Sequence, residues 1–347
     1  MGQPSLILAA LAADALPGLR FVHIQDVSDP DDDLVTALLT TADGQQVILK
    51  SPKSQIALTH LGLEVRALRI LRNVELPFRI PSLLGETTNS AVYKALAFDY
   101  ITGTQVNFDR LKLEDPMVVS IGQTLAQIHS IPTDLVANAG LPEYDPALRN
   151  RERVAEFDRA METGKINPAL LERWQNALLD VNLFRYQPTT VHGAMSDDVL
   201  LRDGDAIVGI NNWSKLAVDD PAVDIAAIYG NCNGDLANAI VLAYEGSTRA
   251  DRNLKQRANL YFELSLANYL LQCIDQGDEE YIAESVRMLD ALHQDLVNGL
   301  LPSLAPTEFA ATEVVTPISQ AASFTSPIAV VTEQIEVLED PKPKDEN

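Results

Sequence analysis

Short apolar runs separated by polar turns characterise roughly the first hundred residues of the chain. The runs that predict β-strands are Phe21 to Val27, Leu34 to Thr40, Gln46 to Leu49 and Ala91 to Tyr100. An Asp43-Gly44 step between the second and third runs favours a hairpin turn. From Leu58 to Leu71 the apolar residues recur at helical spacing instead, so one helix is expected among these strands.

Helical spacing dominates from Leu111 onward. The predicted helices are Val118 to His129, Asn150 to Met161, Leu170 to Leu183, Asp224 to Tyr229, Asp235 to Tyr244, Arg252 to Cys273 and Glu279 to Leu300. Short strand-like runs interrupt them at Thr190-Val191, Val199 to Leu201 and Ile207 to Ile210. The pattern predicts an α+β protein with a small β-rich N-terminal lobe (1–103). A larger helical C-terminal lobe (104–302) follows, with a β-hairpin in its middle.

The N-terminal segment from Leu6 to Leu11 is rich in Ala and Leu. It is shorter than the roughly 20 apolar residues that span a bilayer, and no basic residue precedes it as in a secretory signal. We therefore expect a first amphipathic helix that packs on the domain, and no transmembrane segment in the chain.

The composition changes at about Ser303, after which Ser, Thr, Ala and Val dominate and no Lys or Arg occurs before Asp340. Such a segment buries too little apolar area to offset its ordering entropy, so residues 303–347 are predicted to form a disordered acidic tail. The apolar stretches Pro327 to Val331 and Ile335 to Leu338 leave a second interpretation open, in which the tail binds a protein partner.

Charge narrows the possible partners. The 347 residues include 49 Asp and Glu against 26 Lys and Arg, for a formal net charge of -23. A surface of this sign repels nucleic acid and anionic membranes, so neither is an expected partner. The two cysteines, Cys232 and Cys273, are too few for a disulfide framework and fit a reducing cytoplasm.

One stretch carries a recognisable motif. It reads His192-Gly193-Ala194, then Val199, then Ile210-Asn211-Asn212-Trp213, then Asp220-Pro221 and Asp224-Ile225-Ala226. Together with Leu125 to His129 and Tyr100 to Gly103, it resembles the aminoglycoside phosphotransferase and choline kinase family over roughly residues 5 to 300. That resemblance implies the two-lobed protein-kinase-like fold and, for an active member, ATP and Mg²⁺ as cofactors.

The residues that transfer phosphate in that family are replaced here. Phosphoryl transfer needs a carboxylate that orients the acceptor and ligands that hold Mg²⁺. The position of the family's catalytic Asp is Ala194, and the position of its metal-binding Asn is the apolar Val199. Its second metal ligand, an Asp, corresponds to Asn212, whose amide oxygen carries no charge. No residue is therefore assigned as catalytic or as a metal ligand with the family's own chemistry.

The turn expected to cover the phosphates departs from the family in the same direction. It contains Asp29, Asp31, Asp32 and Asp33 and no glycine. Each carboxylate would repel a triphosphate by on the order of 1 kcal/mol in a solvated setting. Without glycine, the backbone cannot approach the phosphates closely.

The scaffold of the family's site is retained. Lys50 and Glu64 match its phosphate-binding Lys and the helix partner of that Lys, so they are the candidate nucleotide-binding pair; an ordinary surface ion pair is the other interpretation. His192 and Asp224 match the residues that brace the catalytic loop.

Four carboxylates near the motif allow alternatives. Asp197 and Asp198 lie in the degenerate loop as possible substitutes for the missing base or metal ligand, although turn carboxylates that cap the next strand are expected. Asp219 and Asp220 are expected to cap the helix that follows Pro221. His129 is expected to be a packed or surface residue rather than a functional one.

The residues thus favour a cytoplasmic, catalytically inactive member of the family, a pseudokinase that acts in binding or scaffolding. The alternative is an ATP-dependent small-molecule O-phosphotransferase with a rewired site that uses Lys50, Glu64, Asn212 and either Asp197 or Asp198. Such an enzyme could attract a cationic substrate to its acidic large lobe.

Overall fold

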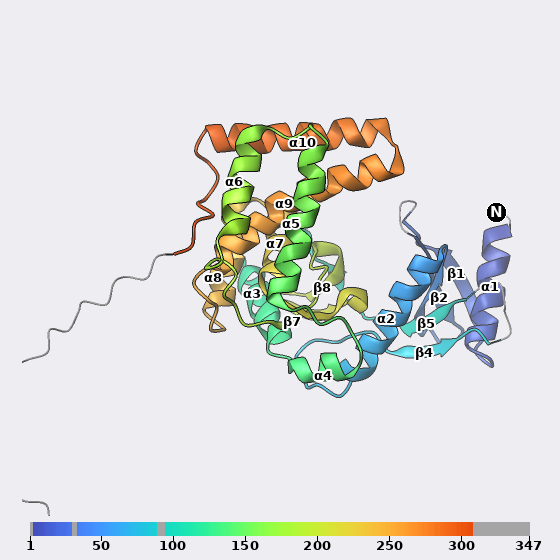
Figure 1. The fold of residues 1–347 in the computed structure, drawn as a ribbon. Coiled ribbons are helices and arrows are strands. Elements are labelled where there is room, and N and C mark those ends of the chain that lie inside the picture. Colours follow the sequence, from blue (N-terminus) through green and yellow to red (C-terminus); the bar gives the residue numbers. More distant parts are fainter. Residues whose placement is uncertain (1–2, 30–32, 89–93, 308–347) are drawn as a thin grey trace, which may run out of the picture. The chain divides into compact units, whose positions relative to one another are not determined.

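The computed structural model describes residues 3–29, 33–88 and 94–307. Asp31, Asp32 and the two apolar stretches of the predicted tail lie outside the described residues. The N-terminal lobe carries a five-stranded antiparallel sheet in the order β1-β2-β3-β5-β4, together with two helices (Figure 1). Their bounds are α1 (Gln3–Ala15), β1 (Phe21–Asp26), β2 (Leu34–Thr41), β3 (Gln46–Pro52), α2 (Gln55–Leu71), β4 (Leu83–Glu86) and β5 (Leu96–Asp99).

Side chains along β3 alternate between the two faces of the sheet, and the two faces have different surroundings. Val47 and Leu49 are fully buried and pack with Leu8 and Leu11 of α1 in the small core of this lobe. The residues that follow each of them, Ile48 and Lys50, point to the opposite face because successive side chains of a strand alternate. That face lines a cleft, so the strand period places Lys50 there.

The C-terminal lobe is mainly helical, as the apolar spacing predicts (Figure 1). Its helices are α3 (Pro116–His129), α4 (Thr133–Asn138), α5 (Pro146–Glu162), α6 (Pro168–Leu179), α7 (Ala222–Asn231), α8 (Gly234–Glu245), α9 (Leu254–Gln276) and α10 (Glu279–Val297), with 3₁₀ turns η1 (Phe108–Arg110), η2 (Asp197–Val199) and η3 (Trp213–Lys215). Gly122 allows α3 to approach α8 closely, since a Cβ there would lie 2.6 Å from the Ile240 carbonyl oxygen. Among the described residues, no helix has the length and apolar character needed to cross a membrane.

The strands of this lobe form two small antiparallel sheets. The predicted hairpin is β8 (Leu200–Asp203) with β9 (Ala206–Ile210), and β6 (Thr104–Gln105) adds to β8. The remaining predicted strand, β7 (Thr189–Val191), pairs instead with β10 (Ala217–Asp219), which the pattern did not reveal. The β7–β10 pairing holds both ends of the segment from His192 to Leu216.

The end of the described chain packs on the C-terminal lobe. Residues 303–307, which the composition assigned to the tail, have no regular structure, yet Leu304 is buried. The backbone N–H of Thr307 donates a hydrogen bond of 2.9 Å to Oδ1 of Asn253, and the Pro302 carbonyl accepts one from Arg173. These contacts extend the packed part of the chain to Thr307.

Candidate functional site

The loop from His192 to Val199 is held by one buried carboxylate. Asp224, on the first turn of α7, accepts the backbone N–H groups of His192 at 2.7 Å and Gly193 at 2.8 Å. Its Oδ2 also lies 3.1 Å from Nε2 of His129. Burial is the largest single effect and acts to raise the pKa of Asp224, but the interactions with His129 and His192 together outweigh it and keep that pKa below its usual value. The predicted brace is thus formed, and His129 is part of it.

His192 ties this loop to the segment that carries Asn212. Its buried ring donates from Nε2 to the Asn211 carbonyl oxygen at 3.0 Å and meets the Trp213 ring edge-on at 4.7 Å. Burial lowers the pKa of His192, since a charged imidazole would lose its hydration there. Gly193 next to it has a φ of +79°, and a Cβ would lie 2.5 Å from the Lys215 carbonyl oxygen, so only glycine fits.

The positions that would carry the transfer chemistry have apolar side chains. Ala194 follows Gly193 in the braced loop and has no polar side-chain atom. Val199 is 2% exposed and belongs to the core, while its carbonyl oxygen accepts the backbone N–H of Asn211 at 3.0 Å. The backbone frame of the site is therefore present without these two functional groups.

Asn212 occupies an unusual backbone position. With φ 59° and ψ 61° it is the one non-glycine residue with positive φ in the described chain, a conformation that Asn tolerates better than most residues. Its Oδ1 accepts a hydrogen bond of 2.9 Å from the Ser214 hydroxyl. This side-chain oxygen is uncharged and already accepts one hydrogen bond, so it is a weaker ligand for a hard cation than a carboxylate would be.

A cleft of about 900 Å³ contains Lys50, Glu64 and Asn212 in its wall. Its apolar lining comes from both lobes and includes Ile48, Phe98, Tyr100, Ile101 and Leu201. Nζ of Lys50 lies 2.9 Å from both carboxylate oxygens of Glu64, which is only 2% exposed, and 5.3 Å from the Phe98 ring centroid. The predicted pair is formed, and Glu64 neutralises the charge of Lys50.

Acidic residues outnumber basic ones around this cleft. Among its described lining residues, four are carboxylates (Asp33, Glu64, Asp99 and Asp198) and two are lysines (Lys50 and Lys215). Asp33, from the acidic turn, accepts a hydrogen bond of 2.6 Å from the Ser54 hydroxyl. The lining disfavours a polyphosphate by its net charge.

The possible substitute carboxylates behave as turn residues. Asp198 is exposed and accepts a hydrogen bond from the Ser196 hydroxyl, and it lines the cleft. Asp197 begins η2 and is not part of the cleft lining. Only Asp198 of the two is thus placed beside Lys50 and Asn212.

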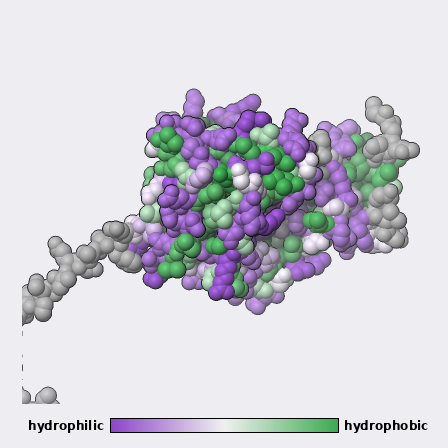
Figure 2. All heavy atoms as spheres, turned by 45° about the horizontal axis from the view of Figure 1, so that its top comes forward, coloured by the Kyte–Doolittle hydropathy of each residue, from purple (hydrophilic) through white to green (hydrophobic). Residues whose placement is uncertain are grey.

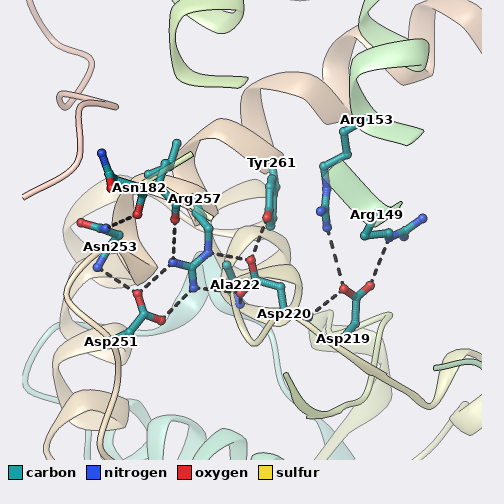
Figure 3. A network of polar contacts seen from close by, with 11 residues as sticks. Arg149, Arg153, Asn182, Asp219, Asp220, Ala222, Asp251, Asn253, Arg257 and Tyr261 are labelled. Carbon is teal, nitrogen blue, oxygen red and sulfur yellow. Dashed lines mark hydrogen bonds and ion pairs between the residues drawn. The ribbon is translucent and has the colours of Figure 1, made fainter. Parts of the chain in front are cut away.

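A second polar cluster surrounds the start of α7 (Figure 3). Asp220 accepts the Ala222 backbone N–H at 2.9 Å at the start of α7, although the N-cap residue of this helix is Pro221, and Asp219 pairs with Arg149 instead of capping the helix. Asp220 also accepts two hydrogen bonds from Arg257, at 2.6 and 3.0 Å, and one of 2.7 Å from the Tyr261 hydroxyl. The pairing of Arg257 with Asp220 could not be predicted from the sequence, because Arg257 lies 37 residues further along the chain, within a long helix.

The donor set does not fit the Mg²⁺-nucleotide of an active family member. Ala194 has no acceptor, Val199 faces the core and the Asn212 oxygen is engaged by Ser214. In the described chain, no three His, Cys, Asp or Glu side chains converge in a way that could hold a metal ion. Hard cations need several oxygen ligands, which these residues do not supply.

Solved structures with the same fold are phosphotransferases. Macrolide 2'-phosphotransferase MphH from Brachybacterium faecium is 22% identical, with a TM-score of 0.69 over 82% of this chain and 98% of that one. A macrolide 2'-phosphotransferase type I is 24% identical, with a TM-score of 0.70 over 82% and 96%. The GDP complex of aminoglycoside 2'-phosphotransferase-IIIa is 19% identical, with a TM-score of 0.71 over 86% and 100%. These similarities confirm the two-lobed kinase-like fold.

Sequence comparison identifies the family. No curated protein matches the chain significantly in sequence. The model of the phosphotransferase enzyme family (APH) matches residues 30–258, which is more than half of the 347-residue chain. The match contains both the Lys50–Glu64 pair and the loop braced by Asp224, and it confirms the resemblance inferred from the motifs. The chain therefore belongs to the APH phosphotransferase enzyme family.

Proposed function

We propose that this protein is a catalytically inactive member of the family, a pseudokinase that acts by binding or scaffolding. The observation that carries the proposal is Ala194, which stands in a loop whose backbone is still fixed by Asp224 at 2.7 and 2.8 Å. A loop that is intact in geometry but lacks its carboxylate cannot orient an acceptor hydroxyl.

Two further features support the proposal independently. Val199 is a core residue without a side-chain oxygen, and the Asn212 oxygen is uncharged and already accepts a hydrogen bond from Ser214, so neither position offers a carboxylate to a metal. The cleft lining has a surplus of carboxylates, with Asp33 held at its edge. Each change alone would weaken nucleotide use, and all act in the same direction.

A second candidate function is a rewired ATP-dependent small-molecule phosphotransferase. It is favoured by one observation, namely that Lys50, Asp198 and Asn212 line the same cleft. Lys50 and Glu64 would then contact the phosphates, and Asp198 would replace the missing carboxylate. Asp197 is the less suitable substitute because it is not part of the lining.

A thermal shift titration with ATP separates the two functions at the binding step. A ligand at about 100 times its dissociation constant adds roughly 2.7 kcal/mol to the stability of the folded state. The rewired enzyme requires a shift that grows in the presence of Mg²⁺ and is reduced in Lys50→Met. For the inactive protein we expect no Mg²⁺-dependent component.

A turnover assay completes the test. ADP release is followed with kanamycin and a macrolide as acceptors, since structural neighbours include a kanamycin complex and macrolide phosphotransferases. We expect the rate to equal that of the protein-free control with either acceptor. Acceptor-dependent release that disappears in Asp198→Asn would establish the rewired enzyme instead.

The proposal includes a cytoplasmic location, which the presence of two free cysteines, Cys232 and Cys273, supports. It also includes a protein partner bound through the apolar stretches of the C-terminal segment, Pro327 to Val331 and Ile335 to Leu338. Removal of residues 308–347 should then abolish capture of that partner from a cytoplasmic extract. An unchanged set of captured proteins would remove this part of the proposal.

A further inference from the structure

A second cavity, of about 570 Å³, is lined by residues of α5, α7 and α9 and shares Lys215 with the cleft. We propose that this cavity, which we call the arginine cavity, binds a small organic anion with an apolar body. It is defined by Arg149, Arg153, Glu156, Phe157, Lys215 and Phe262. The proposal names a ligand class for the binding role proposed above and rests on it.

The charge of the lining is opposite to that of the chain. Arg149, Arg153 and Lys215 line the cavity, whereas Glu156 is the only carboxylate among its described lining residues. The chain as a whole carries -23, so positive charge is concentrated here against the overall composition. A cationic lining with low-dielectric walls attracts anions more strongly than an open surface does.

One buried carboxylate faces both arginines. Arg149 and Arg153 are one helical turn apart on α5 and point toward Asp219, as Figure 3 shows. Nε of Arg149 lies 3.3 Å from Oδ2 of Asp219, and Nη2 of Arg153 lies 4.0 Å from Oδ1. A carboxylate with a single negative charge cannot balance two guanidinium groups. Arg149 has a second partner in the half-exposed Glu152, at 2.9 Å, but Arg153 has no other ion pair in the described chain.

Arg153 is the least compensated of these cations. It is 8% exposed, and its guanidinium carbon lies 3.9 Å from the Tyr261 ring centroid. Its Nη1 is buried without a hydrogen-bond partner among the described residues. Burial of a charge is costly unless opposite charge compensates it, and an anion in the cavity would supply that charge.

Lys215 adds a cation at the mouth of the cavity. Its side chain is exposed, and no described carboxylate lies within ion-pair distance of its Nζ. It lines both the arginine cavity and the cleft, so a ligand in the cavity ends beside the braced loop. Lys215 is therefore free to contact the charged group of a ligand.

The rest of the wall defines the body of the ligand. Phe157, Val223, Phe262, Leu264 and Leu266 line the cavity with apolar side chains. Figure 2 shows one face of the helical lobe as a mixture of hydrophilic and hydrophobic residues. An apolar group would be enclosed here while its anionic group meets the arginines, and a polycation such as an aminoglycoside would be repelled.

Three probes of equal size and different charge test this proposal, with no nucleotide present. They are phenylacetate, phenylacetamide and phenethylamine, titrated into the full-length protein by calorimetry. We expect phenylacetate to bind at least about tenfold more tightly than phenethylamine and to weaken with added salt. Equal or tighter binding of the amine overturns the proposal. So does the absence of detectable phenylacetate binding at about 10 mM, a concentration at least about 10-fold above that of the protein.

Two lysine variants locate the binding. Lys215→Gln should weaken phenylacetate about threefold or more and leave phenylacetamide unchanged, because only the charged probe loses a partner. Lys255→Gln, on α9 outside the lining, should change neither, and Glu156→Gln should tighten phenylacetate. An unchanged affinity in Lys215→Gln places the anion elsewhere and overturns the assignment. Because nucleotide is absent, this failure would leave the turnover test of the proposed function unaffected.

Discussion

The carboxylate of Asp224 lies 2.7 Å from the backbone nitrogen of His192, and this contact helps to fix the loop that contains Ala194. The same carboxylate holds Gly193 at 2.8 Å and His129 at 3.1 Å. Asp224, His192 and His129 are buried and Gly193 is partly buried, so these hydrogen bonds form where water has little access. The backbone of this loop is thus fixed by a buried carboxylate, although Ala194 within it has no polar side-chain atom.

Removal of this brace should be costly. We expect Asp224→Ala to lower the free energy of unfolding by about 3–5 kcal/mol, because it leaves two buried groups and one partly buried backbone N–H without their shared acceptor. Urea denaturation followed by circular dichroism measures the effect. Asp290→Ala, at an exposed position of α10, should change stability by less than about 0.5 kcal/mol. A loss of similar size in both variants would contradict the role assigned to Asp224.

The Lys50–Glu64 pair should show stronger coupling than an exposed pair. A double-mutant cycle with Lys50→Met and Glu64→Gln is expected to give about 1–3 kcal/mol, because Glu64 is almost fully buried and bound by both oxygens. The matched cycle on Arg159 and Asp275, a pair at 3.2 Å with both side chains more than half exposed, should give below about 1 kcal/mol. Equal coupling energies would make Lys50–Glu64 an ordinary surface pair.

Arg257 and Lys255 form a test on one helix. Arg257 is fully buried between Asp220 and Asp251, whereas Lys255 is only half-buried and pairs with Glu245. Arg257→Met should cost about 3–5 kcal/mol because it leaves a buried carboxylate unpaired, and Lys255→Met at most about 1 kcal/mol. Thermal unfolding of both variants checks the difference. A small effect of Arg257→Met would show that water can reach Asp220.

His192 should make the protein less stable in mild acid. Its pKa is lowered by burial, so below pH about 6.5 the unfolded chain takes up a proton that the folded chain does not. The free energy of unfolding therefore falls as the pH drops from 6.5 toward the lower pKa of the folded protein, by at most about 1.4 kcal/mol per pH unit. Above pH 6.5 His192 is neutral in both states, so it causes no such loss of stability. Urea denaturation at pH 7.5 and 5.5 should show a smaller loss in His192→Gln than in wild type. The exposed His23→Gln should retain the wild-type loss; equal losses in all three proteins would exclude His192 as the cause.

Much of the architecture follows from apolar spacing alone. The period-two runs of β2 and β3 and the helical period of α2 are long enough to predict both the elements and the face that carries Lys50. β4 and β10, with four and three residues, are too short to show a period. Their strand conformation comes from pairing with distant segments, which no local pattern contains.

The residues of the candidate site also divide into those that the sequence identifies and those whose contacts depend on the fold. Ala194, Val199 and Asn212 were identified from the motif because the family fixes their order along the chain. The contacts of Arg153 and Arg257 could not be predicted, because each joins residues far apart in sequence through the packing of α5 and α9 against the start of α7. Likewise, His129 appeared as a packed helix residue, and only the fold brings it to Asp224.

Phosphate release from γ-labelled ATP, with protein in excess over nucleotide and Mg²⁺ present, tests the central claim most directly. Excess protein makes a single slow turnover visible, so a weak activity cannot be hidden by slow product release. With Ala194 in the braced loop, we predict a rate equal to that of the protein-free control. A Mg²⁺-dependent rate above that control, lost in Asn212→Ala, would contradict the account.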